Sequence, residues 1–187
     1  MSLAERVRRR FARAPEPVRA VVDASADPDE RVLAWGELAG GGWLVATSLG
    51  LRTVTADGAE DCAALRWHEV GSARWKAAGG GGSFVVTPLA EVEPGVQTRL
   101  ADERHVLTDA GELPGVVRRR VDQTVVTSRR APLPGGGTVL LVARRVPGQA
   151  AREWTVVFDS DEQRSDPVAR EAARAKLAEA VDAEPSA

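Results

Sequence analysis

The stretch LRWHEVGSARWK, residues 65–76, holds the residue types that acid–base or metal chemistry would use. His68 stands beside the carboxylate Glu69, between two tryptophans, with arginines and a lysine close by. Such a pair could move a proton if both side chains faced one substrate, because a general base acts only within hydrogen-bond reach. The first question is therefore whether this stretch serves chemistry or packing.

The side-chain alternation of a β-strand favours packing. Successive side chains point to opposite faces of a strand, so Trp67 and Glu69 are expected on one face and His68 on the other. The histidine and the glutamate would then be a poor acid–base pair. Gly71 and Ser72 are expected to permit a bend or a tight turn, after which Ala73, Trp75 and Ala77 share a face of a second strand. Leu65 and Trp67 are predicted to be core residues.

Neither a metal site nor a known catalytic motif is expected. The other histidine is His105, and neither histidine has a partner at the spacing of metal ligands. The single cysteine, Cys62, forms no internal disulfide and builds no cysteine-based zinc site alone. Nucleophile elbows, phosphate-binding loops and dinucleotide fingerprints are also missing from the sequence. We expect no catalytic residue, no metal and no cofactor.

Composition indicates a globular protein. The chain has 187 residues, of which 43% are hydrophobic and 28% charged. Its apolar runs fall far short of the roughly 20 residues of a membrane span, and no apolar signal region follows the first arginines. A formal charge of -2 disfavours nucleic acid as a partner. The sequence has no Ile, Asn or Tyr, which suggests a GC-rich bacterial genome. A bacterial cytoplasmic protein that binds no nucleic acid is expected.

Residues 2–13 are expected to form a short basic amphipathic helix, because Leu3, Val7 and Phe11 recur on one face. The apolar stripe could dock on the rest of the protein, or the helix could lie on an anionic membrane. A polar stretch at residues 23–30 follows as a linker, so residues 1–29 are predicted to be an N-terminal helix and linker. In the membrane alternative the contacting residues are Arg6, Arg9, Arg10 and Arg13.

From residue 31 onward the pattern is that of β-strands followed by a helix. A stripe of Leu113, Val117, Val121 and Val125, with Pro114 in the first turn, predicts the helix. The strands and helix predict an α+β protein with a small antiparallel β-barrel or sandwich over residues 30–122, closed by that helix. The seven expected strands are RVLAW, GWLVATS, LRTVT, ALRWHEV, SARWKA, SFVVTPL and VQTRL.

Residues 123–187 are expected to form a three-stranded antiparallel sheet with a C-terminal helix, docked on the barrel. The strands are TVVTSRRAPL, TVLLVARRV and EWTVVFDS, and a PGGG turn joins the first two as a hairpin. Asp166 precedes Pro167 at the N-cap position of the helix. The buried stripe of this helix is expected to be Ala169, Ala173, Leu177 and Ala180.

Arginines cluster on the strands of that hairpin. With the turn centred between Gly135 and Gly136, cross-strand residue numbers sum to about 271, which places Arg130 near Leu141. The arginines either solvate the sheet and pair with carboxylates such as Asp159, Asp161 and Glu162, or contact a partner at the free sheet edge. The predicted binding residues are Arg129, Arg130, Arg144 and Arg145.

Two resemblances bear on the fold. The pieces ERVLAWGELAGGGWLVATSLGL, LRWHEVGSARW and LPGVVRRRVDQTVV resemble an actinobacterial family of about this length. Seven short strands with a closing helix resemble the bacterial pleckstrin-homology-like domains, over residues 30–127. Such domains bind lipids, peptides or partner proteins, so the resemblance implies a binding module. The GELAGGGWL hairpin has no basic residue, so the phosphoinositide binding of some of these domains is not expected.

Together these features predict a non-catalytic binding or scaffold module that recognises a protein or peptide partner. Peripheral membrane association through the N-terminal helix is the alternative. An enzyme with an unrecognised type of site is the third and least favoured interpretation, since no nucleophile and base are paired in the sequence.

Overall fold

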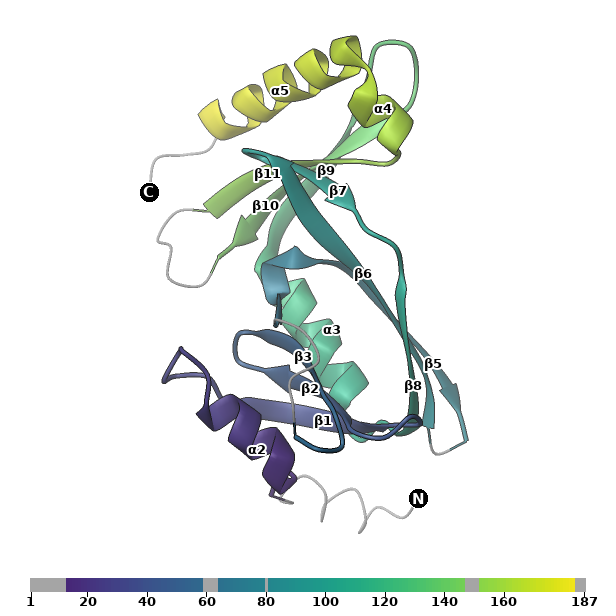
Figure 1. The fold of residues 1–187 in the computed structure, drawn as a ribbon. Helices are drawn as coiled ribbons and strands as arrows, with labels where there is room; N and C mark the ends of the chain where they lie inside the picture. Colours follow the sequence, from purple (N-terminus) through teal and green to yellow (C-terminus); the bar gives the residue numbers. More distant parts are fainter. Residues whose placement is uncertain (1–12, 59–63, 80, 147–151, 184–187) are drawn as a thin grey trace. The chain divides into compact units, whose positions relative to one another are not determined.

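The structure is a computed structural model that describes residues 13–58, 64–79, 81–146 and 152–183. Over these residues the protein is α+β, with a large, mostly antiparallel, open sheet of 11 strands and a C-terminal helix (Figure 1). The chain divides into two compact units, and each is built from two stretches of sequence. The first unit runs to Val86 and resumes over Asp102–Val121, and the second comprises Thr87–Ala101 and the chain from Asp122 on.

The first unit contains most of the strands that the sequence predicts before residue 100. Its strands lie in the order β4-β3-β2-β1-β8-β6, with β5 paired to the outer side of β6. The first four strands pair in succession as antiparallel neighbours, as expected for short runs joined by turns, and β6 pairs antiparallel with β8. The bounds are β1 Val32–Leu38, β2 Trp43–Thr47, β3 Gly50–Val54, β4 Leu65–Arg66, β5 Val70–Ala78, β6 Gly81–Glu93 and β8 Glu103–Asp109.

Helix α3, Leu113–Thr124, follows β8 and confirms the helix predicted from the apolar stripe. Leu113 and Val117 are fully buried in the main core of the first unit, and Val121 packs against that core. Val125, which the stripe included, begins strand β9 instead. The core also takes Leu44 and Phe84 from the sheet, so this helix covers one face of it.

Helix α2, Glu16–Asp23, was not expected from the sequence, which predicted a helix over residues 2–13 followed by a linker. Pro15 and Pro17 instead stand at the start of the helix, where a missing N–H costs nothing. Val18 and Val22 are buried, and Val18 packs against Val45 in a small core with β2 and β3. The basic helix predicted for residues 2–13 falls outside the described residues, apart from Arg13.

The second unit confirms the three predicted C-terminal strands. They are β9 Val125–Pro132, β10 Thr138–Arg145 and β11 Arg152–Phe158, paired antiparallel in the order β11-β10-β9. The sheet does not stop there, because β7, Val96–Arg99, pairs in parallel with β11 and antiparallel with the end of β6. The fifteen residues Thr87–Ala101 therefore belong to this unit by their contacts.

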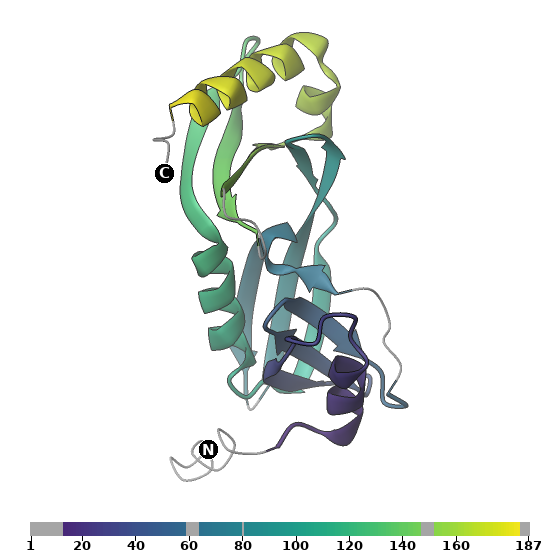
Figure 2. The same cartoon turned by 90° about the vertical axis from the view of Figure 1, so that its left-hand side faces the viewer.

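Two helices end the described chain, α4 over Asp161–Ser165 and α5 over Pro167–Asp182. The predicted N-cap is confirmed, since the Asp166 carboxylate accepts a 2.9 Å hydrogen bond from the Val168 N–H. Ala169, Ala173 and Ala180 are buried, and α5 lies over the sheet of this unit (Figure 2). At the sheet, Glu93 also pairs with Arg170 and Arg174.

The prediction of a small closed barrel is wrong. Over the described residues the strands form an open sheet, and the reason is the length of β6. Its first half pairs with β8, from Gly82↔Leu107 to Val86↔Glu103, while its second half continues past that strand and pairs with β7. The sheet therefore carries on into further strands rather than returning to its first one. Strand β8 was itself missed, because its sequence ERHVLTD reads as mostly polar.

Candidate functional site

The stretch at residues 65–76 is a packing element. Strand β4 ends at Arg66, and Trp67–Glu69 form a single 3-10 turn, so the predicted strand alternation there is wrong. The turn places Trp67 in the main core with 2% of its surface exposed. Its indole Nε1 donates a 3.0 Å hydrogen bond to the Thr47 carbonyl, and its backbone N–H donates to the Leu49 carbonyl at 3.2 Å.

His68 and Glu69 have no arrangement suited to proton transfer. The Glu69 carboxylate accepts a 2.8 Å hydrogen bond from the Arg66 N–H and so closes the 3-10 turn. His68 Nδ1 is buried without a hydrogen-bond partner among the described residues. Beyond the turn, Trp75 packs against the core and meets Phe84 with ring centroids 6.1 Å apart. The packing interpretation of the stretch therefore agrees with the structure.

His105, the second histidine, is a half-buried residue of β8. Burial lowers the pKa of its imidazole, and the charge of Glu103 acts in the opposite direction. Its Nε2 lies 3.8 Å from the Glu103 carboxylate. No group of three potential metal ligands comes together in the described part of the chain, and Cys62 lies outside that part.

The hairpin of β9 and β10 has a register one residue away from the predicted one. Leu140 is opposite Arg130 and Leu141 is opposite Arg129, and a further shift pairs Arg144 with Val125. The reason is the turn, which spans Leu133–Gly137 and closes with a 3.1 Å bond from the Leu133 N–H to the Gly137 carbonyl. A five-residue turn moves every cross-strand partner by one position relative to the four-residue turn assumed from PGGG.

The predicted binding arginines do not share one environment. Arg129 and Arg145 are exposed, and Arg130 is exposed but bound to Asp159 at 2.8 Å, a pairing expected from the sequence. Arg144 is buried, with 5% of its surface exposed. Its guanidinium therefore offers no surface to a partner. Of the arginines proposed for membrane contact, Arg6, Arg9 and Arg10 lie outside the described residues, and Arg13 is exposed.

Among the described residues Arg144 forms no ion pair, although Glu153 is its cross-strand partner on β11. Its Nη1 donates to the Thr124 hydroxyl at 3.1 Å, and its Nε is buried with no partner in that part of the structure. Burial lowers the pKa of the guanidinium. A buried cation that lacks an anionic partner costs free energy of folding, because water solvated it in the unfolded chain.

We predict that Arg144→Met stabilises the protein by about 1 kcal/mol, because methionine keeps the apolar stem and removes the buried charge. The matched substitution Arg145→Met, at an exposed position, should change stability by less than about 0.5 kcal/mol. Urea denaturation of both variants measures the difference. A loss of more than about 2 kcal/mol for Arg144→Met would show that the charge is compensated.

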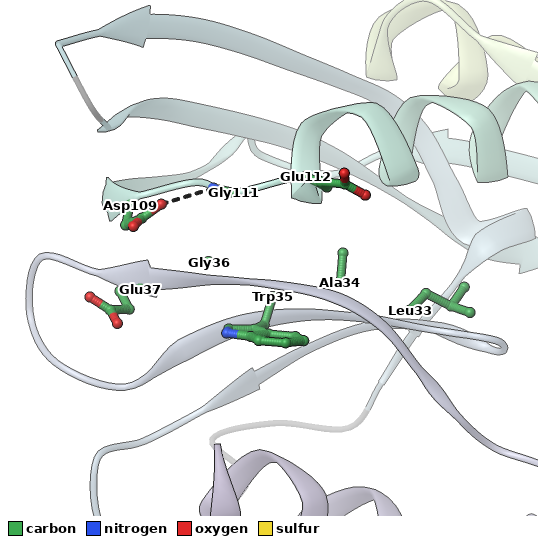
Figure 3. A pocket seen from close by; sticks show the side chains of 8 residues that line it. All are labelled: Leu33, Ala34, Trp35, Gly36, Glu37, Asp109, Gly111 and Glu112. Carbon is green, nitrogen blue, oxygen red and sulfur yellow. Dashed lines mark hydrogen bonds between the residues drawn. The ribbon is translucent and has the colours of Figure 1, made fainter. Parts of the chain in front are cut away.

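A hollow lies in the first unit along the edge of β1 that faces away from β2. Residues Leu33–Glu37 form one side, and the turn between β8 and α3 forms the other (Figure 3). It encloses about 70 Å³, a shallow space that suits one small group or the end of a side chain rather than a whole ligand. We call this feature the β1 hollow, and its lining residues are Leu33, Ala34, Trp35, Gly36, Glu37, Asp109, Gly111 and Glu112.

The hollow exists because β1 and β8 separate. The two strands pair at Leu38↔Leu107 and, after an irregularity, at Glu37↔Asp109, and no residue of β8 is paired with Trp35. The chain turns after Asp109, whose carboxylate accepts a 3.0 Å bond from the Gly111 N–H. This bond directs the chain away from β1 and into α3, so the edge of β1 before Glu37 loses its neighbour.

Backbone alternation aims the polar groups of β1 into the hollow. The Leu38 N–H donates to the Gly42 carbonyl at 3.0 Å, which places Leu38 in a hydrogen-bonded pair with the chain entering β2. Alternate residues of an antiparallel strand bond to opposite neighbours, so Gly36 and Ala34 also face β2. The N–H and C=O of Trp35 therefore point to the other side, where β8 is missing.

Gly36 lets the strand lie this close to the turn. A Cβ atom at this position would stand 3.0 Å from the Asp109 carbonyl oxygen and 3.2 Å from a Leu107 methyl group. Any larger residue would push β1 away from the start of α3 and change the shape of the hollow. Sequence reasoning missed this site, because its two sides are more than seventy residues apart and β8 was not recognised as a strand.

Comparison with known proteins finds no relative of this chain, which matches no family model, no curated protein and no solved structure. The described helices are too short or too polar to cross a membrane. Function is therefore inferred from the site and not from kinship.

Proposed function

We propose that this protein is a non-catalytic binding module that takes an extended segment of a protein or peptide partner at the β1 hollow. The single observation that carries the proposal is the edge of β1 that faces away from β2, where the backbone of Trp35 has no partner strand and faces the hollow. A peptide can add to such an edge as a further strand, with main-chain hydrogen bonds for affinity and neighbouring pockets for side-chain selection.

The arrangement of the first unit supports a pleckstrin-homology-like fold, which we include in the proposal. Its strand order is β4-β3-β2-β1-β8-β6-β5, which holds six of the seven expected strands with β8 in place of VQTRL, and α3 follows the last strand in sequence.

A library experiment tests the proposal. Random twelve-residue peptides are displayed on phage, selected on the immobilised full chain, synthesised, and titrated into 15N-labelled protein. We expect amide shift changes confined to Leu33–Glu37 and Asp109–Glu112. Changes along β9 instead would contradict the proposal and favour the free edge of the arginine hairpin.

A proline substitution gives a sharper measure of strand addition. Trp35→Pro removes the N–H that faces the open side of β1, and proline is tolerated where a strand N–H has no ladder partner. We expect this variant to bind the selected peptides about tenfold more weakly than its control, the value of about one hydrogen bond. Trp35→Ala keeps the N–H and is the matched control. Equal affinities for both variants, with unchanged melting temperatures, would refute strand addition.

A further inference from the structure

Another hollow of the first unit lies where β5, β6 and β8 run side by side, on the face of these strands that is turned away from the main core (Figure 1). It encloses about 410 Å³, within the usual size range of sites for small ligands. Its lining includes Lys76 and Ala78 of β5, Ser83 of β6, and Arg104 and Val106 of β8. We call it the β6 hollow, and its lining residues differ from those of the β1 hollow.

The alternation of side chains along β6 and β8 identifies this face. Phe84 belongs to the main core, so its neighbour Ser83 points to the opposite face of β6. Val106 is the cross-strand partner of Ser83, and Arg104 lies two residues before Val106 on the same face. Val106 keeps 50% of its surface exposed, although β8 lies between β1 and β6 in the sheet. The β6 hollow therefore has an open apolar floor in the middle of a sheet.

The two cations of the β6 hollow have no anionic partner among the described residues. Lys76 and Arg104 are both exposed, and neither forms an ion pair in that part of the chain. The carboxylates next to Arg104 interact elsewhere: Asp102 is bound at 2.7 Å by an arginine of β5, and Glu103 lies 3.8 Å from the imidazole of His105. Two positive charges beside one hollow attract an anion into it.

Ser83 adds a hydrogen-bond donor to the two charges. Its Oγ is buried and has no hydrogen-bond partner in the described structure. Buried hydroxyls are normally hydrogen-bonded, and an unpaired one costs free energy of folding. An anionic oxygen in the hollow would accept this bond while the cations balance its charge. Ala78 and Val106 offer only apolar contact, so the remainder of a well-matched ligand is hydrocarbon.

We propose that the β6 hollow binds a small organic anion, a carboxylate carried on a hydrocarbon chain. The carboxylate lies between Lys76 and Arg104 and accepts the hydrogen bond from Ser83. The hydrocarbon chain covers Val106 and removes its exposed surface from water. This site goes beyond the proposed function, because it lies on other strands than the edge that takes the peptide segment.

The test uses octanoate as the probe. Octanol, which lacks the charge, and inorganic phosphate, which lacks the chain, are its matched controls, and each is titrated into the 15N-labelled full chain. The protein variants Lys76→Gln and Arg104→Gln each remove one charge, and Ser83→Ala removes the hydroxyl. Arg119→Gln removes an exposed charge from α3, outside the hollow, and is the control variant.

We expect octanoate to shift the amides around Ser83 and Arg104 with a dissociation constant of about 1 mM or lower, and both controls to bind about tenfold more weakly. Each of the three substitutions in the hollow should weaken octanoate binding about fivefold, and Arg119→Gln should leave it unchanged. Added salt should also weaken octanoate binding.

Four outcomes would overturn the inference. Octanoate that shifts no amide of the β6 hollow is not a ligand there. Equal binding of octanol would show that the cations select nothing, and equal binding of phosphate would show that the apolar floor contributes nothing. Unchanged affinity in both charge variants would place the carboxylate elsewhere. All four leave the peptide site at the β1 hollow untouched, since its own titration maps to different amides.

Discussion

Replacing Trp67 with alanine is expected to lower the free energy of unfolding by about 3–5 kcal/mol. The indole is almost fully buried beside Leu44, Leu51 and Val70 in the main core of the first unit. Its removal leaves a cavity and also leaves the Thr47 carbonyl without the 3.0 Å hydrogen bond from Nε1. Thr47 is completely buried, so water cannot replace that bond cheaply.

His68→Ala is the matched control, one residue along the same 3-10 turn. Its imidazole is partly exposed, and its buried Nδ1 has no partner to lose among the described residues, so the cost should stay within about 0.5 kcal/mol. Urea denaturation of both variants at neutral pH gives the comparison. Equal destabilisation by the two substitutions, or folding that requires added zinc, would contradict the packing role of the turn.

Features that depend on neighbours in the chain were predictable from the sequence. Helix α5 begins where Asp166 and Pro167 indicate, and its alanine stripe is buried, because capping and helical periodicity act over one or two turns. Helix α3 follows its apolar stripe as far as Thr124 for the same reason. The three C-terminal strands were likewise marked by dense runs of apolar residues between turns.

Features set by distant partners were not predictable. Strand β8 exposes most of its side chains. It forms a strand because it pairs with β6, where Phe84 is opposite His105 and Val85 is opposite Arg104. The stretch after Arg66 has strand-like composition, yet the contact of Trp67 with the turn at Thr47 bends it into a 3-10 turn. Long-range contacts override a local alternation when they bury more surface.

The hairpin and the hollow show how small local differences move a candidate site. Gly135, Gly136 and Gly137 all have positive φ, so the turn takes five residues and shifts the arginine register by one. The ladder shifts again between Ala143 and Arg144, and Arg144, predicted to lie on the surface with the other arginines, is buried. The β1 hollow depends on where β8 stops pairing, which no local pattern encodes.

The last prediction concerns the buried carboxylate Glu30, which precedes β1. Its side chain is fully buried, and it accepts bonds from Arg52 Nε at 2.8 Å and Arg52 Nη2 at 2.7 Å, together with one from the Ser25 hydroxyl. Burial alone would raise the pKa of the Glu30 carboxyl. Hydrogen bonds from Arg52, Ser25 and Thr47, with the charge of Arg52, outweigh burial and lower the pKa from 4.5 to about 2.

A depressed pKa stabilises the fold above the pKa of the unfolded chain, and that stabilisation is lost as the pH falls from about 4.5 to about 2. The shift corresponds to about 3 kcal/mol.

Glu30→Gln should therefore cost about 3 kcal/mol or more at pH 7, where it leaves Arg52 buried beside a neutral amide, and progressively less as acid protonates the wild-type carboxyl. Urea denaturation from pH 7 to pH 2.5 measures both proteins, with the exposed substitution Glu16→Gln expected to follow wild type throughout. Acid breaks the Glu30–Arg52 pair in the wild type, and the substitution has already broken it in the variant, so the two free energies of unfolding should converge at low pH. A difference that stays constant down to pH 2.5 would mean that the Glu30–Arg52 pair does not set the acid stability of this fold.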